Sequence, residues 1–391
     1  MNRTGTYAQF QNEIYEAGVR GEKPSLPVSI EELEALARNS IPQEAYDYIA
    51  GGAGSESTMR FNLEAFHQWR IVPRMLRDVS TRDLRVGLFG TVLPAPVLLA
   101  PIGVQSIAHP EGEVATARAA RSLNLPFVYS TAATKTPEEV AAAAGDCPRW
   151  YQLYWPSDRE ITRSFIERAE TAGYSALVVT LDTRLLAWRE RDLASAYLPF
   201  LKGEGLGIYF SDPMFRSRLE KPPEEDPAAA ITAWMPYFSD LTHDWDDLAY
   251  LRDCTSMPLV LKGIMHPDDA LHAVKCGVDA LIVSNHGGRQ VDGAMAALDA
   301  LPGIVAIVDG KLPVLFDSGI RRGSDILKAL ALGATAVLVG RPYMWGLATG
   351  GDAGVAEVLN RLLADFDITM AMSGFTSLAE LTPSVLSRHS P

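Results

Sequence analysis

Short apolar runs alternate with longer amphipathic stretches along most of the chain, from about residue 95 onward. Residues 176–179 and 336–339 are apolar at every position, as expected of parallel strands whose two faces are both buried. The eight runs lie at residues 96–101, 126–130, 150–154, 176–180, 258–262, 279–284, 313–317 and 335–340. Strands that alternate with helices indicate βα units, and eight units favour a closed (β/α)8 TIM barrel over an open sheet. The pattern therefore predicts an α/β protein.

One interval breaks the rhythm of these runs. Successive runs end at Ser130, Tyr154 and Thr180, at intervals of 24 and 26 residues, but the next run ends 82 residues later, at Lys262. The extra residues predict an insertion over 183–245, with a charged and proline-rich stretch at 221–227. Long loops on compact barrels are commonly active-site lids or disordered segments. Because this loop follows a strand end, where barrel active sites lie, we expect a lid.

Residues 1–95 lie outside the eightfold pattern. Within them, residues 29–50 have the pattern of helices, with Ser29 as a candidate N-cap. We therefore expect an N-terminal helical extension over 1–95, packed on a barrel over 96–391. Its helices could close the bottom of the barrel or reach its top.

Composition and charge narrow the possible partners. The 35 basic and 48 acidic residues give a net charge of −13, which argues against nucleic acid and anionic membranes as partners. No apolar run approaches the roughly 18 residues of a membrane helix, and the first residues lack a signal-peptide pattern. With no peroxisomal tripeptide in the last residues, we expect a cytoplasmic protein. Three scattered cysteines and the lack of an HExxH motif predict neither disulfides nor a metal site.

Polar and charged residues gather where the apolar runs end. Active sites of TIM barrels lie at the carboxyl ends of the strands, so these side chains are expected at one rim. They are Gln152, Tyr154, Thr180, Asp182, Lys262, Ser284, His286, Arg289, Asp317 and Arg341. Burying unpaired charge is costly, so an accidental collection of this kind is not expected.

The last two strand ends have the composition of a phosphate site. They read Asp-Ser-Gly-Ile-Arg-Arg-Gly at 317–323 and Gly-Arg-Pro at 340–342. Glycine N–H groups, a helix N-terminus and the guanidinium of Arg321 or Arg341 can bind phosphate there, although the glycines could serve only tight turns. No GxGxxG motif follows a strand, which argues against a Rossmann dinucleotide site.

The sixth strand end carries the most informative pair, His286 and Arg289. An imidazole with a reference pKa of about 6.5 can act as a neutral base, a guanidinium can hold a carboxylate, and Asp182 could stabilise the imidazolium. Lys262 has three interpretations. It could be a Schiff-base lysine, a fixed positive charge beside an electron-accepting cofactor, or a structural ion-pair partner.

Several motifs together resemble the FMN-dependent L-2-hydroxy-acid oxidase family, which includes glycolate oxidase, flavocytochrome b2, lactate oxidase and lactate monooxygenase. They are Tyr-Asp-Tyr at 46–48, Gln-Leu-Tyr at 152–154, Thr-Leu-Asp-Thr at 180–183, Leu-Lys-Gly at 261–263, Ser-Asn-His-Gly-Gly-Arg-Gln at 284–290 and the 317–323 segment. The resemblance runs from about Tyr46 to the C-terminus. It implies FMN as cofactor, a small 2-hydroxy acid and O2 as reactants, and a homo-tetramer or homo-octamer.

The resemblance also implies a role for each matching residue. His286 would be the base with Asp182 as its partner, Tyr154 would bind the substrate hydroxyl, and Lys262 would stabilise the reduced flavin. The substrate carboxylate would be bound by Tyr48, Arg189 and Arg289. The other cofactor-binding residues would be Pro101, Ile102, Gly103, Ser130, Gln152, Thr180 and Ser284 around the ring, and Asp317, Gly319, Arg321, Gly340 and Arg341 at the ribityl phosphate.

Four positions depart from the usual family pattern. Ala132 stands where glycolate oxidase has Trp, which leaves room for a methyl or larger group on C2. Ser318 replaces the commoner Gly, and Gly103 the commoner Ala, both similar to lactate-active relatives. Arg184 stands where relatives often have Pro, which leaves the geometry at the start of the insertion open.

These departures favour the subgroup of lactate 2-monooxygenase, which converts L-lactate and O2 to acetate, CO2 and water. The missing methyl at Gly103 and a closed lid would keep pyruvate and peroxide together in a water-poor pocket. The alternatives are a lactate oxidase that releases pyruvate and peroxide, another 2-hydroxy-acid oxidase, a Schiff-base aldolase using Lys262, and a barrel that binds FMN or phosphate without turnover.

Overall fold

The described part of the chain, residues 6–238 and 240–389 of a computed structural model, contains a closed barrel of eight parallel strands. The strands are β4 (Val97–Leu99), β5 (Phe127–Ser130), β6 (Arg149–Leu153), β7 (Leu177–Thr180), β8 (Leu259–Ile264), β9 (Ala280–Val283), β10 (Val314–Phe316) and β11 (Ala336–Val339). They follow one another around the barrel in chain order, and β11 closes onto β4. The predicted TIM barrel is confirmed, and each of the eight apolar runs overlaps one of its strands.

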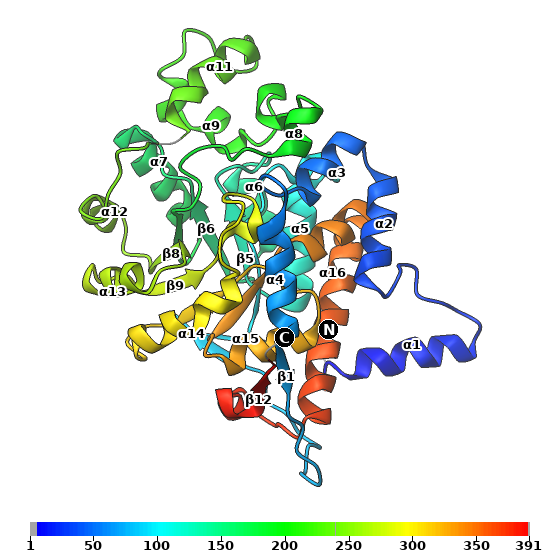
Figure 1. The fold of residues 1–391 in the computed structure, drawn as a ribbon. Helices are drawn as coiled ribbons and strands as arrows, with labels where there is room; N and C mark the ends of the chain where they lie inside the picture. The colour runs from blue at the N-terminus through cyan, green and yellow to red at the C-terminus, as the bar shows by residue number, and fades with distance from the viewer. Residues whose placement is uncertain (1–5, 239, 390–391) are drawn as a thin grey trace.

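Helices cover the outside of the barrel, one after each strand (Figure 1). They are α5 (Gly112–Leu123), α6 (Pro137–Ala144), α7 (Arg159–Thr171), α12 (Leu248–Cys254), α13 (Pro267–Lys275), α14 (Ala297–Val308), α15 (Gly323–Ala331) and α16 (Arg341–Met372). Strand residues alternate between two cores: Leu177 and Val179 of β7 pack under the helices, while Val178 points into the barrel. This alternation explains why both faces of each strand are apolar.

The strand register places the predicted site residues side by side. Thr180 at the end of β7 pairs with Lys262 of β8, and Ser130 of β5 pairs with Gln152 of β6. Lys262 is followed by a register shift before Ile264, so β8 is irregular just after the lysine. The side chains named from the sequence are therefore collected at one rim by the parallel register itself.

The N-terminal segment has elements at both ends of the barrel. Its helices are α1 (Gln9–Val19), α2 (Ile30–Ser40), α3 (Gln43–Ala50) and α4 (Ser57–His67). The Ser29 hydroxyl caps α2 as predicted, accepting a bond of 3.3 Å from the Glu32 N–H. Helix α3 lies at the carboxyl-terminal rim, where Tyr48 and Ile49 line a pocket.

Besides these helices, the described part of the segment contains three short strands. Strand β1 (Trp69–Ile71) pairs with β12 (Leu386–Arg388) near the C-terminus. Strands β2 (Val86–Leu88) and β3 (Thr91–Leu93) form a hairpin. Leu88 and Leu93 of this hairpin pack into the same core as the inward-facing strand residues. A β-hairpin, rather than a helix, therefore fills the amino-terminal end of the barrel.

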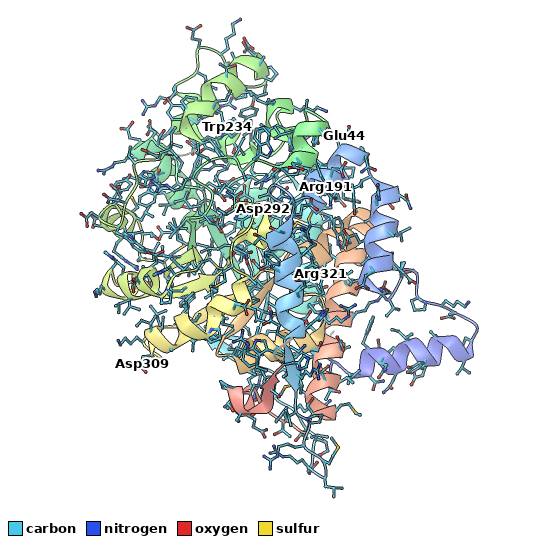
Figure 2. The ribbon with its side chains drawn as sticks, viewed as in Figure 1. Glu44, Arg191, Trp234, Asp292, Asp309 and Arg321 are labelled. Atoms are coloured by element: carbon cyan, nitrogen blue, oxygen red, sulfur yellow. The ribbon has the colours of Figure 1, made fainter. Side chains whose placement is uncertain are left out.

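The insertion after β7 folds into short helices above the rim (Figure 1). They are α8 (Glu190–Ala194), η2 (Pro199–Lys202), α9 (Gly207–Ser211), α10 (Pro213–Arg216), α11 (Pro227–Trp234) and η3 (Met235–Tyr237). Trp234, labelled in Figure 2, is buried and packs against Phe200. The insertion is fastened to the barrel where the Gly207 N–H donates to the Ala133 carbonyl at 2.9 Å and where Glu204 accepts a bond from Ser106. It is thus a packed structure with its own apolar contacts.

Within the described residues, no helix is both long and apolar enough to cross a membrane.

Candidate active site

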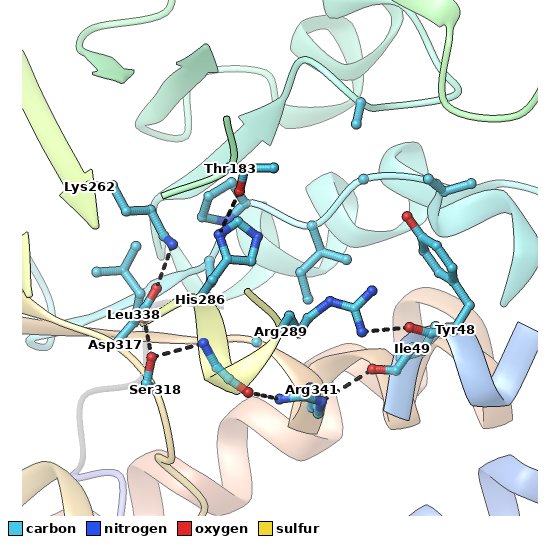
Figure 3. A pocket seen from close by; sticks show the side chains of 18 of the residues that line it. Tyr48, Ile49, Thr183, Lys262, His286, Arg289, Asp317, Ser318, Leu338 and Arg341 are labelled. Carbon is cyan, nitrogen blue, oxygen red and sulfur yellow. Dashed lines mark hydrogen bonds and ion pairs between the residues drawn. The ribbon is translucent and has the colours of Figure 1, made fainter. Parts of the chain in front are cut away.

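A pocket of about 150 Å³ opens at the carboxyl ends of the strands (Figure 3). Its walls come from three parts of the chain: the rim of the barrel, helix α3 and the insertion. The predicted site residues that line it are Tyr48, Pro101, Ile102, Gly103, Tyr154, Arg189, Lys262, His286, Arg289, Asp317, Gly319, Arg321, Gly340 and Arg341. The predicted residues outside this lining are Ser130, Gln152, Thr180, Asp182 and Ser284. Of these, Ser284 bonds to Lys262 and Asp182 to His286, which both line the pocket.

His286 is bonded on both ring nitrogens. Its Nδ1 lies 2.7 Å from Asp182 Oδ1, and its Nε2 lies 3.4 Å from the Tyr154 hydroxyl. Burial opposes ionisation of Asp182, but the nearby His286 and Lys262 outweigh it and hold the pKa of this carboxyl below its usual value. An ionised Asp182 can only accept a hydrogen bond, so Nδ1 carries the proton and Nε2 presents its lone pair. Such an imidazole can accept a proton at Nε2.

Charge and burial also fix the states of the two residues beside Asp182. Burial lowers the pKa of His286, with a further lowering by the positive charge of Lys262, and Asp182 compensates only in part. Burial raises the pKa of Tyr154 to about 12, so its hydroxyl stays protonated at neutral pH and can donate. His286 and Tyr154 therefore offer a neutral base and a hydroxyl donor at one point of the pocket wall.

Lys262 is a buried cation held by two partners. Its Nζ donates to Ser284 Oγ at 3.0 Å. It also lies 3.3 Å from Asp317 Oδ2, as Figure 3 shows. Burial would lower the pKa of Lys262, but the carboxylates of Asp317 and Asp182 raise it overall. A lysine that stays charged is a poor nucleophile. This arrangement supports a fixed positive charge and disfavours a Schiff base.

Two guanidinium groups meet at the side of the pocket next to α3. Arg289 donates through Nη1 to the carbonyls of Tyr48 and Gly51, at 2.6 and 2.7 Å, and its guanidinium lies 5.1 Å from the centre of the Tyr48 ring. Arg189 donates through Nε to the Arg289 carbonyl at 3.1 Å. Burial, with the nearby Arg189, lowers the pKa of Arg289 to about 10. A guanidinium whose pKa is lowered by a neighbouring cation is stabilised by an anionic ligand. The planar guanidinium of Arg289 suits a carboxylate.

Two buried polar atoms behind the pocket test whether a flavin ring fits. In the described chain, Gln152 Nε2 and Thr180 Oγ1 have no hydrogen-bond partner. The carboxamide of Gln152 is oriented by Ser130, whose hydroxyl donates to Oε1 at 2.8 Å. Buried polar groups without partners are costly. A ring with polar edges, such as isoalloxazine, would satisfy both, so these residues fit the predicted cofactor.

The other end of the pocket fits a phosphate. Arg321 and Arg341 are half-buried, and among the described residues neither guanidinium forms an ion pair with a carboxylate. They bond instead to the carbonyls of Ile320, and of Ile49, Gly51 and Gly287. Burial lowers the pKa of both arginines. Gly340 precedes the first turn of α16, where the helix dipole favours an anion. This end therefore carries uncompensated positive charge.

The surroundings of three predicted cofactor-binding residues, Asp317, Gly103 and Gly319, show why these residue types are present. The Asp317 carboxylate pairs with Lys262, and because like charges repel it is better suited to a hydroxyl of the cofactor than to its phosphate. A Cβ on Gly103 would lie 2.6 Å from both the Cβ and the carbonyl oxygen of Ala132, so close packing against Ala132 is a reason for glycine there. Gly319 has φ +101°, and a Cβ on it would meet the Asn62 carbonyl at 2.7 Å.

The structure adds residues that reasoning from the sequence did not assign to the site. Leu186, Phe200 and Phe238 of the insertion line the pocket, and Thr183 Oγ1 lies 3.3 Å from His286 Nδ1. Thr183 had a signal, because it belongs to the 180–183 motif. The insertion residues had none, since an apolar residue in a long loop looks the same whether it faces a ligand or the loop's own core.

The sequence is similar to those of known proteins over most of its length. The model of a family described as FMN-dependent dehydrogenase matches residues 37–388. The chain is 44% identical over 378 residues to the FMN-dependent alpha-hydroxy acid dehydrogenase qulF of Penicillium citrinum, covering 96% of this chain and 94% of that protein. It is 43% identical over 355 residues to an L-lactate oxidase of Lysinibacillus sphaericus (strain C3-41), covering 91% of each.

Solved structures show the same architecture. A crystal structure of mandelate oxidase superimposes with a TM-score of 0.81 at 37% identity, covering 92% of this chain and 98% of that chain. A glycine-to-alanine mutant of an active chimera of (S)-mandelate dehydrogenase gives a TM-score of 0.83 at 38% identity, covering 92% of this chain and 99% of that chain.

Proposed function

The chain belongs to the FMN-dependent dehydrogenase family, with FMN as cofactor and 2-hydroxy acids as substrates, and we propose that its substrate is L-lactate. The observation that carries the proposal is the pairing of a neutral base with a carboxylate site on one pocket wall. The base is His286, with its Nε2 beside the Tyr154 hydroxyl. The carboxylate site consists of the guanidinium groups of Arg289 and Arg189. A 2-hydroxy acid carries a hydroxyl and a carboxylate on one carbon, C2, and so presents both groups to this wall at once.

Different side chains would bind the substrate and accept its proton. Arg289, Arg189 and Tyr48 would hold the substrate carboxylate, which fixes C2 in front of His286. Tyr154 would hydrogen-bond the substrate hydroxyl, and His286 would take a proton at Nε2. Asp182, 2.7 Å from Nδ1, would stabilise the imidazolium so formed. Bound FMN supplies the two-electron acceptor that these side chains lack.

A different group of residues would hold the cofactor. Lys262 would present a positive charge where negative charge develops on the reduced ring. Ser130, Gln152, Thr180 and Ser284 would bond its polar edge, with Pro101, Ile102 and Gly103 against it. Asp317 would accept a bond from a ribityl hydroxyl. Gly319, Arg321, Gly340 and Arg341 would bind the phosphate.

The remaining wall selects the group on C2. Ala132, Leu186, Phe200 and Phe238 line the pocket with apolar atoms. They present no charge to the C2 substituent, and Ala132 is small. A methyl group, as in lactate, or a larger apolar group suits this wall.

We propose that the reaction with O2 is that of lactate 2-monooxygenase. Pyruvate and hydrogen peroxide, formed in the same pocket, would react there: peroxide oxygen adds to the pyruvate carbonyl, and acetate, CO2 and water leave. The insertion supports this outcome, because its packed side chains cover the pocket and slow release. Release of free pyruvate and peroxide is the alternative, which the names of two relatives, L-lactate oxidases of Lysinibacillus sphaericus and Nostoc, favour.

Product analysis under air separates the two outcomes. We expect one acetate per L-lactate consumed, with little pyruvate or peroxide. In Gly103→Ala the new methyl must displace the Ala132 segment, so the pocket loosens and the product should shift toward pyruvate. Gly303→Ala is the matched control, because its Cβ would meet only Pro267, at 3.6 Å. Stoichiometric pyruvate and peroxide from the parent enzyme would establish the oxidase, and an unchanged ratio in Gly103→Ala would remove this glycine from the explanation.

A further inference from the structure

The segment that carries His286 is a left-handed turn. His286, Gly287 and Gly288 have φ values of +58°, +65° and +76°. Glycine adopts such angles readily, but a residue with a Cβ does so at a cost. The backbone of His286 is therefore in a conformation that is unfavourable for a residue with a side chain. Interactions from outside the turn must hold it.

Each backbone N–H of residues 285–288 is bonded to a side chain. The His286 N–H donates to Ser284 Oγ at 3.0 Å, and the Gly288 N–H donates to Asn285 Oδ1 at 3.1 Å. The N–H groups of Asn285 and Gly287 both donate to Ser318 Oγ, at 3.3 and 3.0 Å. Ser318 is the partner that comes from another strand end, after β10. It accepts two of the four bonds.

Ser318 is also bonded toward Lys262. Its hydroxyl donates to Asp317 Oδ1 at 2.8 Å, and Oδ2 of the same carboxylate lies 3.3 Å from Lys262 Nζ. Both Ser318 and Asp317 are buried. One hydroxyl thus uses its single proton and accepts two N–H bonds, which is its full capacity.

The backbone of Ser318 makes this serine unexpected. Its φ is +89°, a region in which glycine is favoured. Glycine would relieve the backbone but remove all three hydrogen bonds. A strained residue whose side chain is fully bonded at a pocket wall is a candidate for a functional role.

We propose that Ser318 is a positioning residue for His286: its hydroxyl holds the left-handed turn in place and ties that turn to the Asp317–Lys262 ion pair. The inference rests on the proposed role of His286 as base. Ser318 itself touches neither reacting atom. It fixes the imidazole relative to the fixed charge of Lys262, the two groups that must face the substrate and the cofactor together.

Two variants separate the hydroxyl from the backbone. Ser318→Gly removes the hydroxyl and suits the φ of +89°, while Ser318→Ala removes the hydroxyl and keeps the Cβ. We expect both to lower the limiting rate of anaerobic flavin reduction by L-lactate about tenfold, with KM changed less than threefold. The unfolding midpoint should fall in both variants, and less in Ser318→Gly, which suits the backbone, than in Ser318→Ala. If Ser318 only shaped the backbone, Ser318→Gly would reduce flavin at the parent rate, and the proposal would be wrong.

Hydrogen exchange of the FMN-loaded protein supplies a readout that does not depend on turnover. Loss of the hydroxyl should speed exchange in the peptide covering 284–290 about tenfold in both variants. Leu76→Gly is the control, because Leu76 is fully exposed and also has a positive φ, +56°, away from the pocket. Unchanged exchange in both serine variants would overturn the proposal. If no 2-hydroxy acid reduced the flavin of the parent enzyme, the proposed function would be contradicted instead. Hydrogen exchange would then still test whether Ser318 stabilises the turn.

Discussion

His286 is subject to opposing influences on its charge. Burial and the positive charge of Lys262 favour the neutral imidazole, while Asp182 at 2.7 Å favours the imidazolium. The net effect lowers the pKa of His286 below its usual 6.5. In the proposed reaction, proton acceptance by His286 would be favoured by Asp182, whose pKa is held below its usual value. A base of this kind is neutral at physiological pH and still stabilised once it is protonated.

The lowered pKa gives a signed prediction for pH dependence. Because only the neutral imidazole can accept a proton, kcat/KM should fall as the pH drops through the pKa of His286, with a midpoint below 6.5. His286→Ala should lower the rate about 10²–10⁴-fold and abolish this acid limb. The pH profile of flavin reduction by L-lactate measures both. A variant that keeps the parent rate, or an acid limb that survives the substitution, would show that another group is the base.

The sequence predicts which residue types reach the rim but not how they pair there. Lys262 and His286 could be placed because each follows an apolar strand, and the parallel register collects strand ends. That Asp317 pairs with Lys262 depends on side-chain directions at a turn with φ values of +89° and +101° at Ser318 and Gly319. Apolar periodicity carries no information about such angles.

Helix α4, from the N-terminal segment, anchors the loop that contains the left-handed turn at residues 286–288. The side-chain amides of Asn62 on α4 and Asn285 bond to each other in both directions, at 2.8 Å each, and both residues are buried. Asp292, labelled in Figure 2, lies in the same loop, and its carboxylate accepts N–H bonds from Ser55, just before α4, and from Ser57, its first residue. These four hydrogen bonds join α4 and the residues just before it to the loop that follows β9.

Removing one amide of this pair should destabilise the protein. Asn62→Leu removes both bonds between the two amides and the acceptor of the Ala297 N–H, at a cost of about 1–3 kcal/mol in the free energy of unfolding. Urea unfolding of the FMN-loaded enzyme measures it. Asn12→Leu on the exposed face of α1 is the control, with an expected change within about 0.5 kcal/mol. Equal stability of the two variants would mean that the reciprocal amide pair contributes nothing measurable.

At the level of elements, the hydrophobic pattern decided what could be predicted. The parallel strands were recognisable because each is apolar on both faces and is followed by a helix. Strands β2 and β3 contain a glycine and a threonine, are buried at one position each, and are followed by no barrel helix, so they lack this pattern. Their role at the bottom of the barrel follows from tertiary contacts of Leu88 and Leu93, which no local pattern reports.

The whole molecule concentrates positive charge at one pocket despite its net charge of −13. Arg189, Arg289, Arg321, Arg341 and Lys262 converge there from different parts of the chain. The barrel makes this possible, since strand ends distant in sequence open onto one rim. A substrate carboxylate and a cofactor phosphate can each be held locally although acidic residues outnumber basic ones in the chain.

The insertion was predictable as an interval, but its contacts were not. The interval of 82 residues between the ends of two successive runs indicated that a segment is inserted after β7. Its attachment through Glu204 and Gly207, and the entry of Phe200 and Phe238 into the pocket wall, depend on how its short helices pack. The homo-tetramer or homo-octamer expected from the family resemblance, and the cytoplasmic location, stay predictions.

The central claim is that FMN in this pocket is reduced by a 2-hydroxy acid through His286, and anaerobic titration tests it most directly. L-lactate added to the purified yellow protein without oxygen should bleach the flavin absorbance rapidly, whereas D-lactate should not. Loss of the bleaching in His286→Ala, with FMN still bound, would assign the reaction to this site. A protein that carries FMN but keeps its colour with L-lactate and with larger 2-hydroxy acids would contradict the account.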